Sequence, residues 1–300
     1  MHSGIDVGGT KTEFSIFDHD FKRIHSHRTK TPVDDYAAFI RTISELVAGG
    51  DASYGKECTI GVGLTGLVDR QGRSFSVNVP CLNGMQVQDD LVAAIGRRVC
   101  CINDVRAFAL SEARGGAAEG CDTMVGIILG TGAASGTCHN GILNVGANGV
   151  AGEWGHLPMA AGLMQRHKLP TFECSCGNTG CAELYVSGPG LARLAQHFIN
   201  EDVDSAECVA RFRQGDSAAG NVINIWIDCV ASIVSQLVLH INPDVIVVGG
   251  GLSNIDELYG RVPDIAKTML PATVSPPPIR RAVFGDDSGV RGAAIIGADS

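Results

Sequence analysis

The stretch CSCGNTGC holds three cysteines, Cys174, Cys176 and Cys181, whose spacing suits metal binding. Their C-x-C-x4-C pattern differs from the C-x-x-C pattern of redox pairs, and thiols separated by one residue form strained disulfides. Three thiolates need one further ligand to complete a tetrahedral zinc site. His156 in GEWGH is the best candidate, because His167 lies in a basic segment without a recognisable motif. The pattern favours structural zinc, with free thiols as the alternative.

Three glycine-rich turns have the composition of phosphate-binding loops. The first, DVGGTKT, resembles a Walker A loop, but Thr10 separates Gly9 from Lys11 and a strand follows, so the Walker interpretation fails. Its backbone N–H groups can still contact phosphate, and a plain hairpin turn is the alternative. The other turns are GTGAASG and the GGG of VVGGGLSN, which ends an apolar strand where α/β sheets place ligands. We therefore expect a nucleotide between two domains. The candidate nucleotide-binding residues are Asp6, Gly8, Gly9, Thr10, Lys11, Gly130, Thr131, Gly132, Gly136, Gly249, Gly250 and Gly251.

Asp104 is the candidate catalytic carboxylate. It follows the apolar segment RRVCCIN and precedes the helical pattern VRAFALSEA. One interpretation is a helix N-cap. The other is a carboxylate at a strand end that orients an acceptor hydroxyl and takes its proton during phosphoryl transfer.

The hydrophobic pattern predicts an α/β fold that positions these residues. We expect strands at 3–9, 12–18, 58–64, 97–104 and 242–251, and helices at 34–49, 89–96, 105–116, 218–241 and 289–298. In the second strand Phe14 and Ile16 alternate with polar residues, which predicts one buried face. Asp34 is expected to cap the first helix and Gly49 to lie near its end.

The segment TMVGIILGTGAASGTCHNG, residues 123–141, repeats the strand–turn–strand plan of the N-terminus, so we expect two related halves. The predicted boundary lies near residues 115–120. The first domain would then comprise residues 1–117, completed by a C-terminal helix at about 289–300. The second would comprise residues 118–288, including the zinc-binding loop.

Composition excludes several classes of protein. A chain of 300 residues with 45% hydrophobic residues suits two domains. The net charge of −9 argues against nucleic acid or an anionic membrane as a partner. No apolar stretch reaches the ~20 residues of a membrane helix, and the N-terminus is unlike a signal peptide. We therefore expect a cytoplasmic protein whose 11 cysteines are reduced.

Seven motifs, in order along the chain from Asp6 to Ala294, resemble those of the ROK family (repressors, open reading frames and kinases), and the resemblance as a whole runs over residues 4–297. They are DVGGTKTE, IND, LGTG, AGEWGH, CSCGNTGC, PDVIVVGGG and GDDSGVRGAA. The resemblance implies an actin-like, ribonuclease H-like ATPase fold in which two domains close on ATP and a hexose. The chain departs from the family at NDVR, where NDAN is usual, and at GTGAASG, where GTGxGGG is usual.

The resemblance also implies roles for single residues. Asp104 would be the general base that activates the sugar 6-hydroxyl, and ATP would bring Mg²⁺, for which Asp6 is a candidate ligand. His156, Cys174, Cys176 and Cys181 match the family's structural zinc site. The residues expected to bind the sugar are Asn78, Asn103, Glu153, His156 and Glu183. We expect a homodimer.

The preferred sugar is less closely specified by these motifs. NVP at 78–80, FALSEA and the segment preceding the cysteines resemble N-acetylglucosamine kinases, whereas AGEWGH and SNIDELYG resemble manno(fructo)kinases. We expect 6-phosphorylation of N-acetyl-D-glucosamine, with fructose or mannose as the alternative substrate. A repressor would carry a DNA-binding domain ahead of the first glycine turn, where only five residues precede Asp6. A sugar-binding protein without catalysis is the last alternative, and the retained Asp104 argues against it.

Overall fold

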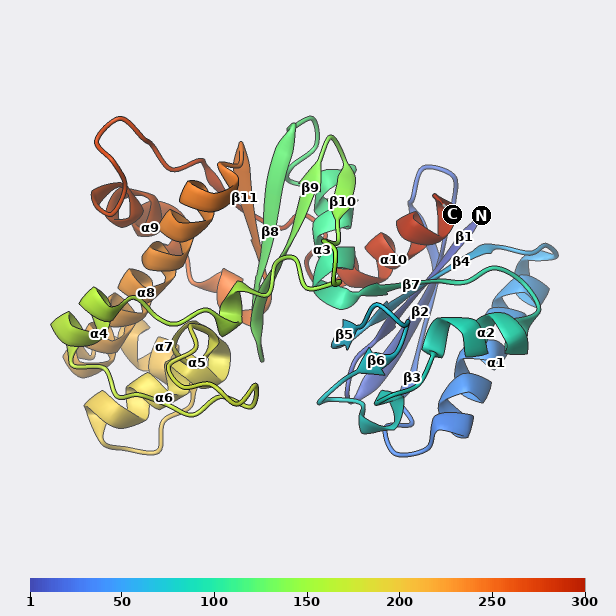
Figure 1. Cartoon of the computed structure of the whole chain (residues 1–300), viewed down its shortest axis with the longest axis horizontal. Coiled ribbons are helices and arrows are strands. Elements are labelled where there is room, and N and C mark those ends of the chain that lie inside the picture. Colours follow the sequence, from blue (N-terminus) through green and yellow to red (C-terminus); the bar gives the residue numbers. More distant parts are fainter. Residues whose placement is uncertain (300) are drawn as a thin grey trace. The chain divides into compact units, whose positions relative to one another are not determined.

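The computed structural model describes residues 1–299 and shows a mixed α/β protein (Figure 1). Its residues form two compact units. The first unit comprises Met1–Gly120, Gly136–Ala151 and the chain from Val283 onward, and the second comprises Cys121–Ser135 and Gly152–Ala282. The predicted α/β class is confirmed.

The first unit is built on a five-stranded sheet with the order β3-β2-β1-β4-β7. Its strands are β1 (His2–Val7), β2 (Lys11–Phe17), β3 (Arg23–Lys30), β4 (Thr59–Leu64) and β7 (Cys100–Asn103). Strands β1, β4 and β7 run parallel, and β2 pairs antiparallel with both β1 and β3. The carboxyl ends of the parallel strands therefore lie along one edge, which places the first glycine turn and Asp104 on that edge.

Helices cover both faces of this sheet. One face packs on α1 (Tyr36–Tyr54) and α2 (Val87–Ile95), with Phe14 and Ile16 in the shared core. The other face packs on α10 (Ser288–Ala298), which also lies against α3 (Asp104–Ala113). The helix and sheet backbones are close: a Cβ atom on Gly61 would lie 1.7 Å from the Ala293 carbonyl oxygen. The small residues of this helix, which include Gly292, Ala293 and Ala294, permit this approach.

Three local predictions are wrong. Strand β2 is buried on both faces, because α10 covers the side that carries Ser15, which is 0% exposed. Helix α1 is capped by the side chain of Asp35, which accepts from Ala38 N, and not by Asp34. The helix also continues through Gly49 to Tyr54 and ends at Gly55, which adopts the left-handed conformation at φ +66°. Strand β3 was not expected, since it is exposed and basic and lacks an apolar pattern.

A buried carboxylate holds the segment that enters α10. Glu112 on α3 is 0% exposed. Its oxygens accept from Val283 N at 3.0 Å, Phe284 N at 3.2 Å and Ser288 Oγ at 2.8 Å. These bonds explain how the motif GDDSGVRGAA, far along the chain, is tied to the helix that begins at Asp104.

The second sheet has the order β10-β9-β8-β11-β12. Its strands are β8 (Thr123–Leu129), β9 (Ala133–His139), β10 (Ile142–Asn144), β11 (Val245–Gly249) and β12 (Ile279–Arg281). The helices of the second unit are α4 (Ala161–His167), α5 (Glu183–Val186), α6 (Gly188–Ile199), α7 (Ser205–Arg213), α8 (Ser217–Ile241) and α9 (Glu257–Thr268). Strand β11, expected within 242–251, is fully buried and pairs parallel with β8 and β12. The smaller elements are β5 (Leu67–Val68), β6 (Ser74–Phe75), and the 3₁₀ turns Pro80–Leu82, Trp154–His156, Gly251–Asn254 and Gly285–Asp287.

Helix α8 corrects the expectation that no segment is long and apolar enough to cross a membrane. Within residues 1–299 it alone meets that criterion, with 25 residues. However, 78% of its apolar window is buried inside the structure. Trp226 of α8 is 0% exposed and donates to the Val186 carbonyl at 3.0 Å. The helix therefore packs as the central core helix of the second unit.

Candidate active site and metal centre

The turn between β1 and β2 is held by two threonines that the motif did not include. Gly8 N donates to Lys11 O at 3.0 Å, which closes the turn. Thr31 Oγ1 donates to Gly8 O at 2.7 Å and lies 2.9 Å from Thr12 Oγ1, while Thr31 N donates to Thr10 O at 3.3 Å. Both threonine side chains are buried. Thr31 follows β3 by one residue, so an apolar pattern could not have identified it.

Asn78 lies against the same turn. A Cβ atom on Gly9 would lie 2.9 Å from the Asn78 carbonyl oxygen, so this close approach requires glycine. The Asn78 amide donates to Thr65 Oγ1 at 3.4 Å, at the end of β4. The structure thus brings one predicted sugar-binding residue next to the predicted phosphate-binding turn.

Asp104 begins α3, but Asn103 caps that helix. Asn103 Oδ1 accepts from Arg106 N at 3.2 Å, and its Nδ2 donates to Gly66 O at 2.8 Å. The N-cap interpretation of Asp104 is therefore wrong by one residue. Asp104 Oδ1 instead accepts from Val105 N at 2.9 Å and from Asn103 Nδ2 at 3.0 Å. Two donors on one oxygen orient the carboxylate at the end of β7.

Asp6 lies in the electrostatic field of the same carboxylate. The pKa of Asp6 is raised to about 7, mainly by burial and also by the negative charges of Asp104 and Glu13, against a lowering effect of Lys11. Gly289 at the start of α10 packs against its carboxylate oxygens. Two like charges near one strand edge are a chemically suitable place for a cation.

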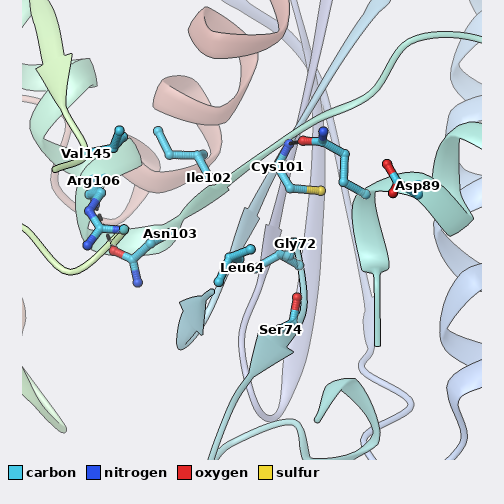
Figure 2. A pocket seen from close by; sticks show the side chains of 12 residues that line it. Leu64, Gly72, Ser74, Asp89, Cys101, Ile102, Asn103, Arg106 and Val145 are labelled. Carbon is cyan, nitrogen blue, oxygen red and sulfur yellow. Dashed lines mark hydrogen bonds between the residues drawn. The ribbon is translucent and has the colours of Figure 1, made fainter. Parts of the chain in front are cut away.

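A cavity of about 210 Å³ borders Asn103 and Arg106 (Figure 2). Arg106, the departure in NDVR, is 5% exposed, and its guanidinium donates to Ala151 O through Nε at 3.4 Å and Nη2 at 3.2 Å. Arg106 therefore ties the start of α3 to the segment that precedes Gly152. Its carbonyl partner explains how a buried guanidinium is tolerated.

In the second unit the glycine turn that begins at Gly130 is held by backbone bonds. Gly130 N donates to Gly132 O at 3.0 Å, and Gly188 N donates to Gly130 O at 2.7 Å. Ser135, one of the departures, is buried and its N donates to Gly152 O at 2.9 Å. Gly250, at φ +82°, approaches Leu129 O so closely that a Cβ atom would lie 2.5 Å from it.

A hollow of about 760 Å³ lies beside these turns. Its lining includes predicted residues Gly130, Thr131 and Gly251. The lining residues that were not predicted as nucleotide-binding are Gly188, Pro189, Ala192, Asp204, Ser205, Ala206, Val209, Leu252, Asn254 and Ile255, of which the last three lie in or beside the motif VVGGGLSN. The sequence SGPG at 187–190, a fourth glycine-rich turn at the start of α6, was the available signal. Gly132, Gly249 and Gly250 do not line the hollow.

Gly136 belongs to the first unit and packs on α3. A Cβ atom there would lie 2.6 Å from Ala109 Cβ and 3.1 Å from Arg106 Cα. Packing alone accounts for this glycine.

In the second unit, Glu153 precedes the turn Trp154–His156, and Glu183 Oε2 accepts from Ala133 N at 2.9 Å.

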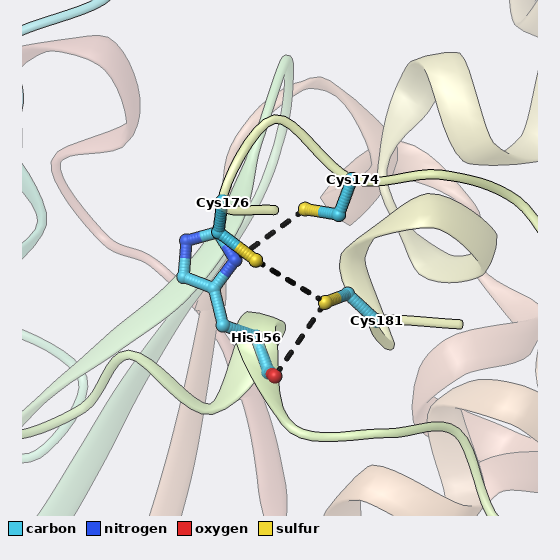
Figure 3. Close-up of side chains that lie close together, drawn as sticks. All are labelled: His156, Cys174, Cys176 and Cys181. Atoms are coloured by element: carbon cyan, nitrogen blue, oxygen red, sulfur yellow. Dashed lines mark hydrogen bonds between the residues drawn. The ribbon is translucent and has the colours of Figure 1, made fainter. Parts of the chain in front are cut away.

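The predicted metal ligands come together (Figure 3). The ligand atoms of His156, Cys174, Cys176 and Cys181 all lie within 4.8 Å of one another. Cys176 Sγ lies 3.6 Å from Cys181 Sγ, and Cys174 Sγ lies 3.7 Å from His156 Nδ1. A tetrahedral zinc ion with the usual bond lengths separates its ligands by about 3.5–3.8 Å, so the cluster fits zinc. His167 instead pairs with Asp228 at 2.8 Å.

The thiols of this cluster differ in acidity. A backbone hydrogen bond from Asn178, followed by bonds to neighbouring thiols, lowers the pKa of Cys176 to about 7. Burial raises the pKa of Cys181 to about 12. One accessible thiolate beside buried thiols is a suitable starting point for binding a metal that displaces the remaining protons.

Comparison with solved structures defines the class of protein. The ROK hexokinase from Thermus thermophilus has a TM-score of 0.88 and 27% identity, with 99% of each chain covered. A ROK family glucokinase from Streptomyces griseus, solved with glucose and AMPPNP, has a TM-score of 0.79 and 26% identity, covering 100% of this chain and 99% of that one. The predicted actin-like sugar-kinase fold is confirmed.

The chain belongs to the ROK family, which matches residues 2–299. The N-acetylgalactosamine kinase AgaK of Shewanella sp. (strain ANA-3) is 42% identical over 297 residues, covering 99% of this chain and 96% of that protein. The N-acetyl-D-glucosamine kinase of Vibrio cholerae serotype O1 (strain ATCC 39315 / El Tor Inaba N16961) is 38% identical over 299 residues, with 99% of each covered. The predicted family is confirmed. The predicted activity, that of an ATP-dependent sugar kinase, agrees with the names of these relatives, which are sugar kinases.

Proposed function

We propose that this protein is an ATP-dependent kinase that phosphorylates the 6-hydroxyl of N-acetyl-D-glucosamine, with Asp104 as general base. The main support is the oriented carboxylate of Asp104 at the end of β7, in a chain whose relatives are named N-acetylhexosamine kinases. A carboxylate held in one orientation can align the acceptor hydroxyl and accept its proton as the phosphoryl group transfers.

The nucleotide would occupy the hollow of the second unit. Gly130, Thr131 and Gly251 offer backbone at its wall, and Gly188 begins helix α6 there. Backbone N–H groups at such turns and at a helix N-terminus bind phosphate oxygens. The Streptomyces griseus glucokinase was solved with AMPPNP, which supports a nucleotide site in this fold.

The first unit would bind the sugar through Asn78 and Asn103 and would present the base. In the second unit, Glu153 and Glu183 would accept hydrogen bonds from sugar hydroxyls, and His156 would donate one to a sugar hydroxyl. Mg²⁺ bound with ATP would neutralise charge on the transferring phosphoryl group. Asp6 is the residue we assign to it, since a cation offsets the like charges that raise its pKa.

Zinc would be held by His156 Nδ1 and the three cysteine thiolates, as a structural ion without an open position. Because Nδ1 faces the thiols, Nε2 is the nitrogen that would carry a proton and donate to the sugar. We further propose that the two units correspond to the two predicted domains, residues 1–117 with the C-terminal helix and residues 118–288, except that Gly136–Ala151 and the residues from Val283 group with the first domain. We also propose that the protein is a homodimer.

N-acetyl-D-galactosamine is a second candidate substrate, because the relative of that name is 42% identical to this chain. The two sugars differ only in the configuration at position 4. Fructose and mannose remain the alternatives from the motifs AGEWGH and SNIDELYG.

The test is kcat/KM for ADP release with N-acetylglucosamine, N-acetylgalactosamine, glucose, mannose and fructose, followed by identification of the phosphorylated position. A site that hydrogen-bonds an acetamido group should penalise sugars that lack it, because its polar partners are then unpaired. We expect kcat/KM for N-acetylglucosamine to exceed kcat/KM for glucose at least about tenfold. Preference for fructose or mannose would overturn the substrate, and absence of turnover with every sugar would overturn the kinase.

A further inference from the structure

Glu183 contacts the backbone of the second glycine turn. Its Oε2 accepts from Ala133 N at 2.9 Å. A Cβ atom on Gly132 would lie 2.9 Å from the same oxygen, so the carboxylate lies directly over the peptide between Gly132 and Ala133. The proposed sugar contact of Glu183 does not account for this bond.

The segment that carries Glu183 holds the turn at two points. Glu183 begins α5 and binds Ala133, and five residues later Gly188 N donates to Gly130 O at 2.7 Å. Gly130 also lines the hollow beside Thr131. The two anchors therefore flank Thr131, which lines the hollow proposed to hold a nucleotide.

Neighbouring contacts leave little freedom to this arrangement. A Cβ atom on Gly155 would lie 2.0 Å from Ala133 O and 3.3 Å from Glu183 Cβ, so the turn and α5 are packed against the Trp154–His156 turn. Ala182 N donates to Leu157 O at 2.8 Å, which fixes the residue just before Glu183. Cys181, a predicted zinc ligand, precedes it by one more residue.

We infer that Glu183 is a positioning residue for the nucleotide-binding turn, which it holds through the Ala133 N–H. This inference rests on the proposed nucleotide site. The carboxylate of Glu183, which is expected to contact the sugar, is thus also bonded to the turn that is expected to contact phosphate. Because a hydrogen bond from a backbone N–H to a carboxylate is stronger than one between neutral groups, its loss should loosen the turn.

The test is the Kd for ADP, measured by calorimetry in the absence of sugar. A sugar contact alone predicts no change when Glu183 is replaced, since no sugar is present. We expect Glu183→Ala to weaken ADP binding on the order of tenfold, as for loss of one charge-assisted bond at the site. Glu183→Gln retains an oxygen that can accept from Ala133 N and should bind ADP within about threefold of the wild type.

A shorter side chain separates geometry from charge. Glu183→Asp keeps the negative charge but lacks one methylene, so it should fail to reach Ala133 N and should bind ADP more weakly than Glu183→Gln. If the carboxylate merely repelled phosphate, both Glu183→Ala and Glu183→Gln would bind ADP more tightly. If Glu183→Ala does not fold, the comparison of Glu183→Asp with Glu183→Gln still tests the positioning role.

Glu173→Ala is the matched control, because it removes an exposed carboxylate from the same cysteine-bearing loop. It should leave the Kd for ADP unchanged. Wild-type affinity in Glu183→Ala, or Glu183→Asp binding ADP as well as Glu183→Gln, overturns the positioning role alone. A wild-type protein that binds no ADP overturns the proposed nucleotide site and this inference with it.

Discussion

Replacing Asp104 by asparagine should separate chemistry from sugar binding. In the wild type, Val105 N donates to Asp104 Oδ1 at 2.9 Å, and the asparagine keeps an oxygen that can accept this bond. The helix cap at Asn103 is not altered. The fold should therefore be retained, with a change in the free energy of unfolding within about 1 kcal/mol. Only the negative charge and the capacity to accept a proton are lost.

The expected loss follows from the role of a positioned base. Turnover, kcat, should fall on the order of 10²–10⁴-fold, which corresponds to about 2.7–5.5 kcal/mol in the activation barrier. The Kd for the sugar should stay within about threefold, since an amide still offers hydrogen bonds to a hydroxyl. Removal of the Asp104 charge should also lower the pKa of Asp6.

The assay is coupled ADP release for kcat, with calorimetry for the sugar Kd. Asp264→Asn, which changes an exposed carboxylate on α9, is the control and should turn over as the wild type does. A value of kcat for Asp104→Asn within tenfold of the wild type would refute the general-base assignment. A large loss of sugar affinity with normal kcat would instead make Asp104 a binding group.

Three other perturbations test the parts that support this site. Metal analysis should find about one zinc per chain. Cys176→Ser should lose the zinc and have a lower melting temperature, whereas Cys121→Ser, which lies outside the cluster, should keep both the zinc and the melting temperature. A zinc-free wild-type protein would contradict the assignment. Thr31→Val removes the hydroxyl that donates to Gly8 O at 2.7 Å, and should raise KM for ATP and lower kcat without changing the sugar Kd. Thr31→Ser keeps a hydroxyl and should restore the KM for ATP and the kcat of the wild type. Equal kinetics for the two variants would refute a role of this hydrogen bond in holding the turn. Gly61→Ala places a methyl group 1.7 Å from Ala293 O and should destabilise the protein by about 3 kcal/mol or more in urea unfolding. Gly260→Ala on α9, which meets no atom within 4 Å, should be neutral or slightly stabilising.

The sequence by itself determined the features that depend on residues close together in the chain. The C-x-C-x4-C spacing brings Cys174, Cys176 and Cys181 within reach of one ion, because eight residues with two glycines can fold back on themselves. The alternation of strand and glycine turn predicted β1, β2, β8 and β11, and the pattern of residues 289–298 predicted the C-terminal helix. The ordered set of motifs was enough to recognise the family.

Only the tertiary structure decided the contacts between distant segments. Thr31 braces the Gly8 turn, and Glu183 holds Ala133 across 50 residues of sequence. Gly136 is explained by Ala109, with which it shares no motif, and β3 exists because β2 offers it an edge. Hydrophobic periodicity reports which face of an element is buried, but hydrogen bonds and close approaches depend on which backbone lies opposite. That partner is chosen by the packing of the whole chain, so local sequence carries no record of it.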